Sequence, residues 1–479
     1  MRRQYPYIGG IVTRTSSIQG LDRAGALEED GPRYLQVVRF MERAITDGRL
    51  RPGDRLPPQR QLARALGVDL TTVTRAYAEA RERKLLHANG AMGTFVSAPR
   101  FDTAQVVDLG MNIPPPPLGI DFTALLKRGV DQVLTHTDPH LLMSYHPGGG
   151  SDADRAAGAA WLMPMLGRVD GARIVICPGA QAALAALVLA LSHAGDTVLS
   201  EPVLYPGMIG AAAQLDRRLV AVASDDDGML PDALARAAVE YGARVVYLNP
   251  TLRNPTATSM PTARREEIVA IARKHDLRIV EDDPYWALCD TAPPPFARLA
   301  PERTYYIATL SKALTPGLRT AYVVMPDTAL RSAFVGSLRA VTLLSMPVMT
   351  SLATQWIHDG TAARLLDGVR MEARERQAMA ARILRPVDLA AQAEPVAAEG
   401  IHLWLGLPAR WTARSLTMTA RMEGLAVTPS DAFSTGTPNE QAIRISLGGV
   451  KDRVRLKQGL DRLVQLMEGS DPAVDAVVI

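Results

Sequence analysis

Cysteine is almost absent from this 479-residue chain. Only Cys177 and Cys289 occur, without the paired spacing of metal ligands, so we expect no cysteine-based metal site. Long apolar runs are also lacking: the longest, Ala182–Leu191, falls short of the roughly 20 residues that a bilayer requires, which predicts a buried helix and no membrane partner. The opening MRRQYPYIGG is not followed by the apolar core of a signal peptide, so a cytoplasmic location is expected.

Length and charge indicate more than one domain. A chain of 479 residues, 47% hydrophobic and 22% charged, is globular and too long for one ordinary core. Residues 1–100 carry 17 basic and 10 acidic side chains, a net +7, whereas the remainder carries −4. A basic segment joined to a mildly acidic body suggests a nucleic-acid-binding module. A solvated charged face is the alternative interpretation of the same imbalance.

Apolar residues recur at helical spacing in three segments of the N-terminal hundred residues. A first helix is expected over Tyr34–Leu50 and a second over Gln59–Leu66; Gly67 ends the second, and Asp69 can cap a third. The third has a buried stripe: Val73, Ala76, Tyr77 and Ala80. Its outward side near the N-terminus carries polar residues: Thr71, Thr72, Thr74 and Arg75. A helix-turn-helix needs this layout, because short polar side chains read base edges while arginines contact phosphates.

A β-hairpin is expected after the third helix. The stretch LLHANGAMGTFVSA contains two short strand patterns around Asn89, Gly90 and Gly93, typical of a wing that approaches a DNA groove. Residues 33–97 resemble the winged helix-turn-helix of the GntR family of bacterial regulators, with its pattern GxLxPGxxLPxxRxLAxxLGV, then TVxxAY and GxGTFV. The resemblance implies double-stranded operator DNA as a partner. It also implies these DNA-binding residues: Arg60, Thr71, Thr72, Arg75, Gly93 and Thr94.

The match to this family has departures. Asp69 and Leu70 stand where Ser and Arg are usual, and Lys84 stands where Gly is usual. One basic contact of the family is therefore missing, and the operator sequence cannot be copied from relatives. A helical hairpin that only docks on a larger domain is the alternative to a DNA reader.

A proline-bearing stretch separates this segment from the rest. Pro99 and Pro114–Pro117 cannot continue a helix, so we expect a DNA-binding domain over 30–98, a linker over 99–118 and a second domain over 119–479. In the second domain, short apolar runs alternate with helical patterns, at residues 173–178, 197–202, 244–250, 278–283, 304–310 and 321–326. This alternation predicts an α/β fold with a mainly parallel sheet, in which ligands gather at the carboxyl ends of the strands.

Chemically distinctive residues follow three of these strand patterns. Lys312, in ATLSKALTPGLRTAYVV, follows one strand, and a buried lysine of lowered pKa can form a Schiff base with an aldehyde. Asp282 and Tyr285, in VEDDPYW, follow another strand, and Asn254, in NPTLRNPT, follows a third. A carboxylate keeps a pyridinium nitrogen protonated, while a phenol and an amide can bond the ring oxygen. The pattern predicts three strand ends converging on one ring; a buried hydrogen-bond network is the alternative.

Further residues suit a phosphate and a carboxylate. Gly179, Ala180 and Gln181 begin the helix after IVICP, where N–H groups and the helix dipole favour an anion. Additional donors are expected from Thr309, Ser311 and Arg319. Tyr205 is placed to stack on the ring, and Arg444, in AIRISLGG, to pair with a substrate carboxylate in bidentate fashion. A purely structural role is the alternative for these last two residues.

Across about residues 108–470 the motifs SKxxxPGLR, EDDxY and NPT resemble the fold-type I aminotransferases, which bind pyridoxal 5'-phosphate. The resemblance implies this cofactor, with Lys312 as its covalent attachment point and Asp282 as the partner of its ring nitrogen. It further implies Tyr285 and Asn254 on the ring oxygen. On the phosphate it implies Arg319, Thr309, Ala180 and Gln181.

The chain departs from the fold-type I pattern on its substrate side. Ala321 stands where glycine is usual, and SYHPGGGSDADR only loosely matches the usual YGxPxGxxxLR, which affects substrate handling and leaves the cofactor set intact. His146 and His402 are expected to be structural.

A GntR reader joined to an aminotransferase-like body resembles the MocR subfamily of transcriptional regulators over nearly the whole chain. The resemblance implies a homodimer that holds pyridoxal 5'-phosphate and detects an amine, an amino acid or the vitamer itself. A working aminotransferase (transaminase) with an accessory DNA-binding domain is the alternative. A dimeric scaffold with a relict pocket is a third hypothesis, which the joint presence of Lys312, Asp282, Tyr285 and Arg319 argues against.

Overall fold

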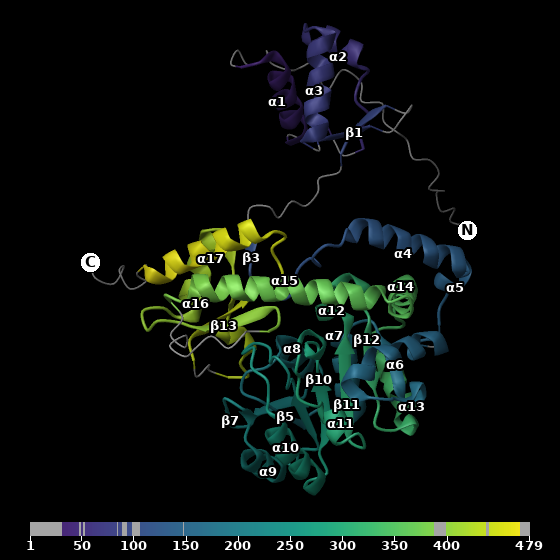
Figure 1. Cartoon of the computed structure of the whole chain (residues 1–479), viewed down its shortest axis with the longest axis vertical. Coiled ribbons are helices and arrows are strands. Elements are labelled where there is room, and N and C mark those ends of the chain that lie inside the picture. The colour runs from purple at the N-terminus through teal and green to yellow at the C-terminus, as the bar shows by residue number, and fades with distance from the viewer. Residues whose placement is uncertain are drawn as a thin grey trace, which may run out of the picture. The chain divides into compact units, whose positions relative to one another are not determined.

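The computed structural model describes most of the chain: residues 31–46, 49–50, 53–83, 85–88, 93–97, 106–146, 148–387, 399–436 and 440–469. Contacts divide the chain into two compact units, one ending at Gln105 and the other beginning at Val106 (Figure 1). Within the described ranges, no helix has both the length and the apolar character needed to cross a membrane.

Three helices and a β-hairpin form the N-terminal unit: α1 (Arg33–Thr46), α2 (Gln59–Leu66), α3 (Leu70–Glu82), β1 (Leu86–Ala88) and β2 (Thr94–Val96). The two strands pair antiparallel, with Leu86 opposite Val96. This order is the predicted winged helix-turn-helix, although α1 ends at Thr46 rather than at Leu50. Asp69 precedes α3 in an extended conformation, but its side chain makes no capping hydrogen bond. Lys84, Asn89 and Gly90 lie outside the described residues.

The core of this unit holds α3 in a fixed orientation. Val73 and Tyr77 on α3 are buried against Val38 and Met41 on α1. The Tyr77 hydroxyl donates a hydrogen bond of 2.9 Å to the carbonyl of Pro57, just before α2. Because one face of α3 is buried in this way, the residues between its buried positions point outward from the unit.

A seven-stranded sheet forms the centre of the C-terminal unit, in the order β4 (Ile174–Cys177), β12 (Ala321–Val324), β11 (Thr304–Thr309), β10 (Arg278–Asp282), β9 (Val245–Leu248), β5 (Thr197–Ser200) and β6 (Arg218–Ala221). β12 is antiparallel to both neighbours and every other pair is parallel, which confirms the predicted mainly parallel sheet. Six strands lie on the predicted apolar runs. β6 was not predicted, because this edge strand has exposed ends and lacks a continuous apolar run.

Alternate residues of each strand enter opposite hydrophobic layers, as the two-residue period of a strand requires. On β11, Tyr305 and Ile307 pack with α7 (Ala180–Leu191), α8 (Pro206–Gln214) and α13 (Arg331–Val341). Tyr306 and Ala308 pack in the layer that contains α6 (Asp152–Leu166) and α14 (Pro347–His358). A neighbouring cluster buries β9 and β10 against α9 (Pro231–Glu240) and α10 (Thr262–Lys274). Helices therefore cover both faces of the sheet.

A smaller lobe follows towards the C-terminus. Its antiparallel sheet has the order β13 (His402–Gly406), β16 (Ala442–Ser446) and β15 (Thr428–Pro429), and α16 (Ala413–Met422) and α17 (Arg453–Glu468) pack on it. The 24-residue α15 (Thr361–Leu384) joins the two lobes, since Leu365 lies in the core of the large lobe and Leu384 in that of the small one (Figure 1). β3 (Val107–Asp108) pairs with β14 (Leu425–Ala426), so the C-terminal unit begins on the small lobe.

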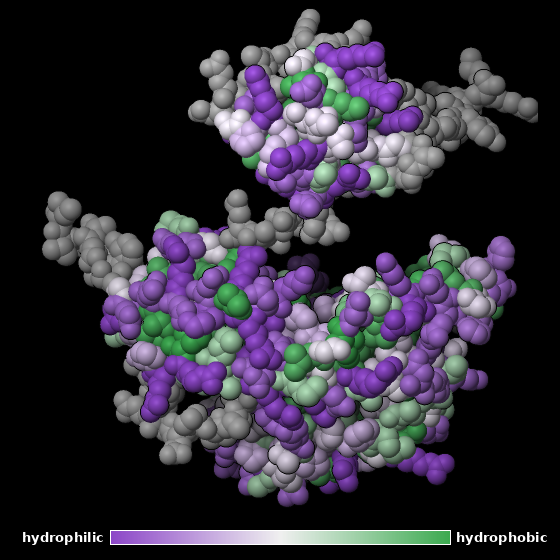
Figure 2. Space-filling view, turned by 45° about the horizontal axis from the view of Figure 1, so that its top comes forward, coloured by the Kyte–Doolittle hydropathy of each residue, from purple (hydrophilic) through white to green (hydrophobic). Residues whose placement is uncertain are grey.

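One further long helix, α4 (Phe122–His136), and several short elements complete the described part of the C-terminal unit: α5 (Pro139–Leu142), η3 (Gly171–Arg173), β7 (Ser224–Asp225), β8 (Gly228–Met229), η4 (Trp286–Leu288), α11 (Phe296–Leu299), α12 (Leu310–Ala313), η5 (Pro316–Leu318), η6 (Thr328–Leu330) and η7 (Ser430–Phe433). Apolar side chains also reach the surface: Figure 2 shows green patches among the hydrophilic residues on the visible face of this unit.

Candidate functional site

The carboxyl ends of the central strands surround one cavity. Its lining comprises Ala180, Gln181, Tyr205, Asn249, Asn254, Asp282, Pro284, Tyr285, Thr309, Ser311, Lys312 and Arg319. All ten residues that the sequence assigned to a cofactor are in this set. The structure adds Asn249 and Pro284. Asn249 begins the first of the two NPT triplets in NPTLRNPT, so the motif could have indicated it, whereas Pro284 carries no such signal.

Asp282 ends β10 with one carboxylate oxygen engaged and the other free of protein partners. Oδ2 accepts a hydrogen bond of 2.9 Å from the hydroxyl of Tyr247 on β9. Oδ1 is buried, and none of the described residues bonds it. Burial raises the Asp282 pKa to about 6, while the Tyr247 bond and the charge of Lys312 act in the opposite direction. The carboxylate thus presents one unmatched acceptor at a cavity.

Lys312 lies on α12, directly after β11. Thr309, the last residue of β11, caps this helix: its side chain accepts a hydrogen bond from the Ser311 backbone N–H. The Lys312 amine donates to the backbone carbonyl of Asn112, 2.5 Å away. Burial is the main cause that lowers the Lys312 pKa to about 8, and the charges of Arg444 and Arg319 lower it further. A neutral amine is consequently accessible near neutral pH, and the neutral amine is the nucleophilic form.

A corner suited to an anion lies where α7 begins. The N-cap residue of α7, Gly179, has no side chain and a φ of 92°, so the first N–H groups of the helix have no side-chain cap. Arg319 lies over this corner, and a Cβ added at Gly179 would lie 2.7 Å from Arg319 Nη2. A helix N-terminus and a guanidinium both attract a phosphate. Thr309 and Ser311 contribute hydroxyl groups to the same cavity.

Two of the remaining predicted ring partners, Tyr285 and Asn254, are held by specific hydrogen bonds. The Tyr285 hydroxyl accepts a hydrogen bond of 2.9 Å from the Asn112 side chain. The Asn254 backbone N–H donates to Asn249 Oδ1 at 2.7 Å, and a cis peptide bond joins Asn254 to Pro255. Tyr205 is the N-cap residue of α8, and burial raises the pKa of its hydroxyl.

Arg444 lies behind this cavity rather than on its wall. It is buried on β16, where Nη1 donates to Asn254 Oδ1 at 2.8 Å and Nη2 donates to the carbonyl of Gly110 at 2.5 Å. Its guanidinium also lies over the Phe433 ring, 5.0 Å from the centroid. The predicted carboxylate clamp is therefore engaged by protein oxygens in this structure.

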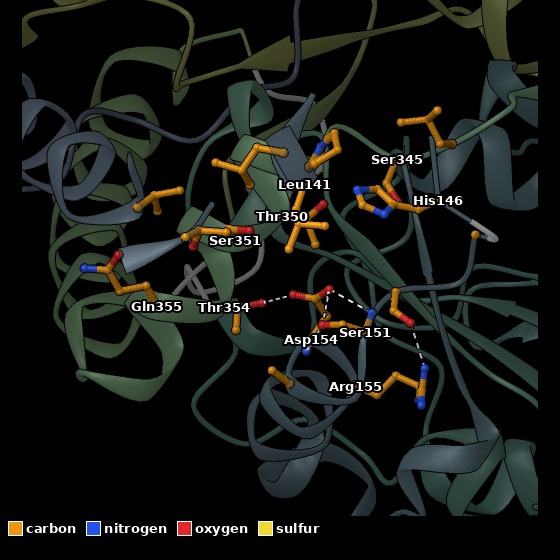
Figure 3. A pocket seen from close by; sticks show the side chains of 18 of the residues that line it. Leu141, His146, Ser151, Asp154, Arg155, Ser345, Thr350, Ser351, Thr354 and Gln355 are labelled. Carbon is orange, nitrogen blue, oxygen red and sulfur yellow. Dashed lines mark hydrogen bonds between the residues drawn. The ribbon is translucent and has the colours of Figure 1, made fainter. Parts of the chain in front are cut away.

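The two histidines expected to be structural differ in their surroundings. His402 is buried beside Tyr285, whereas His146 is exposed and lines a second cavity of about 900 Å³ (Figure 3). In that cavity Asp154 accepts hydrogen bonds from Thr354, at 2.7 Å, and from Ser151. Part of its wall comes from the stretch SYHPGGGSDADR, where the chain departs from the aminotransferase pattern.

The predicted DNA contacts lie on the outer side of α2 and α3 and on the wing. Arg60 and Thr72 line a shallow hollow that also contains Arg33, Arg64 and Asp69. Thr71 and Arg75 are exposed on α3, and the Arg75 guanidinium lies 3.9 Å from the centroid of the Tyr34 ring. On the wing, Gly93 has a φ of 113° and Thr94 begins β2. Arg33 and Arg64 share this hollow but were not among the predicted contacts, because basic residues at unremarkable helix positions carry no motif signal.

Residues 104–463 match the protein family described as aminotransferase class I and II. The chain belongs to this family. Residues 33–96 match the gntR family of bacterial regulatory proteins. A GntR domain joined to an aminotransferase fold is the arrangement of MocR regulators, so the resemblance drawn from the sequence is confirmed.

Two relatives of this MocR-type chain match it over nearly their whole length. The uncharacterized HTH-type transcriptional regulator YdeF of Bacillus subtilis is 27% identical over 447 residues, 91% of this chain and 95% of YdeF. The vitamin B6 salvage pathway transcriptional repressor PtsJ of Salmonella typhimurium is 27% identical over 435 residues, 88% of this chain and 96% of PtsJ. The crystal structure of LysN, an alpha-aminoadipate aminotransferase of Thermus thermophilus complexed with N-(5'-phosphopyridoxyl)-L-leucine, has a TM-score of 0.69 at 24% identity, covering 78% of this chain and 94% of LysN. This likeness shows the fold.

Proposed function

We propose that the protein is a transcriptional regulator that binds operator DNA through its N-terminal unit and uses pyridoxal 5'-phosphate to detect an amino acid, an amine or the vitamer. One observation carries the proposal. A single cavity gathers an unmatched carboxylate oxygen of Asp282, the amine of Lys312 and a helix N-terminus beside Arg319. The same chain contains a gntR domain, and the names of YdeF and PtsJ describe transcriptional regulators.

Each group of pyridoxal 5'-phosphate has a matching partner in the cavity. Asp282 Oδ1 would accept the ring N–H, and Arg319 with the start of α7 would bind the phosphate. Tyr285 and Asn254 would bond the ring oxygen, and Tyr205 would stack on the ring. When bound, the cofactor supplies an aldehyde that takes up amines covalently and a ring that withdraws electrons.

The protonation states of two residues suit this chemistry. With a pKa of about 6, Asp282 is ionised at neutral pH and can hold a proton on a ring nitrogen. With a pKa of about 8, Lys312 is neutral in about one molecule in ten at pH 7, and this fraction rises with pH. The pair therefore supplies an anion for the ring and an amine for the aldehyde under the same conditions.

A working aminotransferase with an accessory DNA-binding domain is the second candidate function. The aminotransferase fold and the likeness to LysN favour it. Mixing cofactor-loaded protein with an amino-acid panel, and then with a keto acid, separates the two functions by following the visible absorbance. A regulator should give one spectral change that a keto acid does not rapidly reverse. Repeated rapid cycling of the absorbance would favour the enzyme.

We also propose that the protein is a homodimer that joins through the surface around the second cavity (Figure 3). Leu141 lines this cavity and is 58% exposed. Met143 and Tyr145, which follow it in the chain, are 74% and 81% exposed, and the exposed Leu343 and Met346 flank the lining residues Leu344 and Ser345. Neighbouring exposed apolar side chains mark interaction surfaces, and a second copy would bury them. A dimer carries two DNA-binding units, which requires two half-sites in the operator.

Arg60→Ala should weaken operator binding by about 1 to 3 kcal/mol, because Arg60 is exposed on α2 beside the start of α3. Affinity is measured by titration of labelled operator at several salt concentrations. Binding should weaken as salt rises, because phosphate contacts release counterions.

The exposed Arg236 of the C-terminal unit provides a control of equal charge, since Arg236→Ala should leave affinity unchanged. Footprints should show paired half-sites. An isolated half-site would contradict the dimer, and unaltered affinity in Arg60→Ala would contradict the DNA contact.

A further inference from the structure

Asn112 is a buried residue that contacts three side chains at once, two through its amide and one through its backbone carbonyl. Its Nδ2 lies 2.9 Å from the hydroxyl of Tyr285 and 3.3 Å from Nδ1 of His402. Its backbone carbonyl accepts the Lys312 amine. The Tyr285 and His402 rings also pack together, with centroids 5.2 Å apart. Neither Asn112 nor His402 lines the cavity, so both stand behind the residues that do.

The tautomer of His402 follows from its neighbours. Its Nε2 lies 3.2 Å from the backbone carbonyl of Arg253, which can only accept a hydrogen bond, so Nε2 carries a hydrogen. Burial lowers the His402 pKa to about 3, and the charges of Arg444 and Lys312 contribute, so the ring is neutral. A neutral ring with hydrogen on Nε2 has a lone pair on Nδ1. His402 Nδ1 is therefore an acceptor.

This tautomer fixes the directions of the remaining bonds. The Asn112 amide must present its nitrogen to His402 Nδ1, and the second hydrogen of that nitrogen then points at Tyr285. The Tyr285 oxygen accepts, so its own proton is not used in this bond. None of the described residues accepts that proton, and Tyr285 lines the cavity.

We propose that Asn112 and His402 are positioning residues that hold the Tyr285 hydroxyl as a hydrogen-bond donor towards the ring oxygen of the cofactor. The proposal rests on the cofactor-binding function proposed above. The positioning acts through a series of hydrogen bonds in which each bond fixes the direction of the next. The Arg253 carbonyl orients the His402 ring, and His402 Nδ1 orients the Asn112 amide. Asn112 then donates to the Tyr285 oxygen and occupies one of its lone pairs. Because the hydroxyl already points at the ring oxygen, it can stabilise negative charge there without the free-energy cost of first reorienting.

Asn112→Ala should raise the pH midpoint of the visible absorbance of cofactor-loaded protein by about one unit, a tenfold change in proton affinity. A hydrogen-bond donor on the ring oxygen stabilises the negative charge of that oxygen. When the donor is disordered, the more basic oxygen holds the proton on the adjacent lysine nitrogen more tightly, so the proton is lost only at higher pH. The charged and titratable groups that act on Tyr285 and Lys312 are Arg444, Arg319, Asp282 and Tyr205, and this substitution leaves all four in place. An unchanged midpoint would overturn the proposal.

A double-mutant cycle with Tyr285→Phe separates positioning from a general structural effect. Tyr285→Phe removes the donor itself and should raise the midpoint at least as far as Asn112→Ala. In the Tyr285→Phe background, Asn112→Ala should then add no further shift. Additive shifts would show that Asn112 does not act through Tyr285, and would overturn the proposal even if both variants fold.

His402→Phe provides a second variant that keeps a ring against Tyr285 and removes both nitrogens. It should raise the midpoint in the same direction by a smaller amount, and this shift should vanish in the Tyr285→Phe background. A shift that persists there would refute the role assigned to His402. Failure of the proposed function gives a different result, because wild-type protein would then develop no visible absorbance with pyridoxal 5'-phosphate.

Discussion

Lys312→Ala is expected to remove all cofactor that borohydride can fix to the protein. Lys312 is the one lysine among the residues that line the cavity, and its lowered pKa of about 8 makes the nucleophilic neutral amine accessible near neutral pH. Borohydride delivers hydride to the carbon of the lysine–cofactor double bond, and the resulting single bond survives denaturation. After borohydride treatment and unfolding, wild-type protein should retain about one cofactor per chain. Mass spectrometry of its peptides should locate the cofactor on the peptide that contains Lys312.

Two controls make this result specific. Lys127→Ala removes an exposed lysine of α4 and should leave the fixed equivalent unchanged. Lys312→Ala should still bind pyridoxal 5'-phosphate reversibly, because Arg319, Asp282 and the start of α7 remain. Label that persists in Lys312→Ala would locate the attachment elsewhere. Wild-type protein that cannot be loaded at all would contradict the proposed cofactor.

The cavity-lining residues could be predicted because several of them lie at or shortly after the end of a strand. Asp282 ends β10, Lys312 follows β11 by three residues and Ala180 follows β4 by three. Parallel strands end at one edge of a sheet, so chemistry placed at those ends meets there without any knowledge of long-range packing. The apolar runs that mark buried strands are the strongest local signal in the sequence.

Asn112 could not be predicted, because long-range packing alone brings it to the site. It lies 200 residues from Lys312 in sequence and sits in a stretch that reads as linker. Close backbone packing fixes its position: a Cβ added at Gly448 would lie 1.8 Å from the carbonyl oxygen of Ile113. Tyr247 was missed for a related reason, since only the pairing of β9 with β10 brings its hydroxyl to Asp282.

The bonds of Arg444 could not be predicted from its motif. The arginine lies behind the cavity, and its bonds to Asn254 and Gly110 depend on how the small lobe packs. A carboxylate ligand that engages both Nη atoms would compete with these oxygens. Such competition would affect Gly110, whose carbonyl bonds Arg444, and displacement of Lys312 would affect Asn112, whose carbonyl bonds the Lys312 amine.

Operator DNA is expected to change effector affinity by roughly 5- to 150-fold, the range that corresponds to a coupling free energy of about 1 to 3 kcal/mol. The expected coupling runs through residues 110–112, whose carbonyls bond Arg444 and Lys312. An effector amine that takes the place of Lys312, and a carboxylate that engages Arg444, would both alter bonds to residues 110–112, shortly after the C-terminal unit begins at Val106. Only an effector with different affinities for two arrangements can shift DNA binding.

This coupling can be measured from the side of the effector. The amino acid or amine that gives the largest spectral change is titrated into cofactor-loaded protein with and without the footprinted operator, and the two dissociation constants are compared. By linkage their ratio must equal the effect of that ligand on operator affinity. In Lys312→Ala the ratio should fall towards one, because the amine no longer competes with a lysine that holds Asn112. Equal effector affinities with and without operator in wild-type protein would show two domains that are fused but not coupled, and the aminotransferase function would then be the better account of the chain.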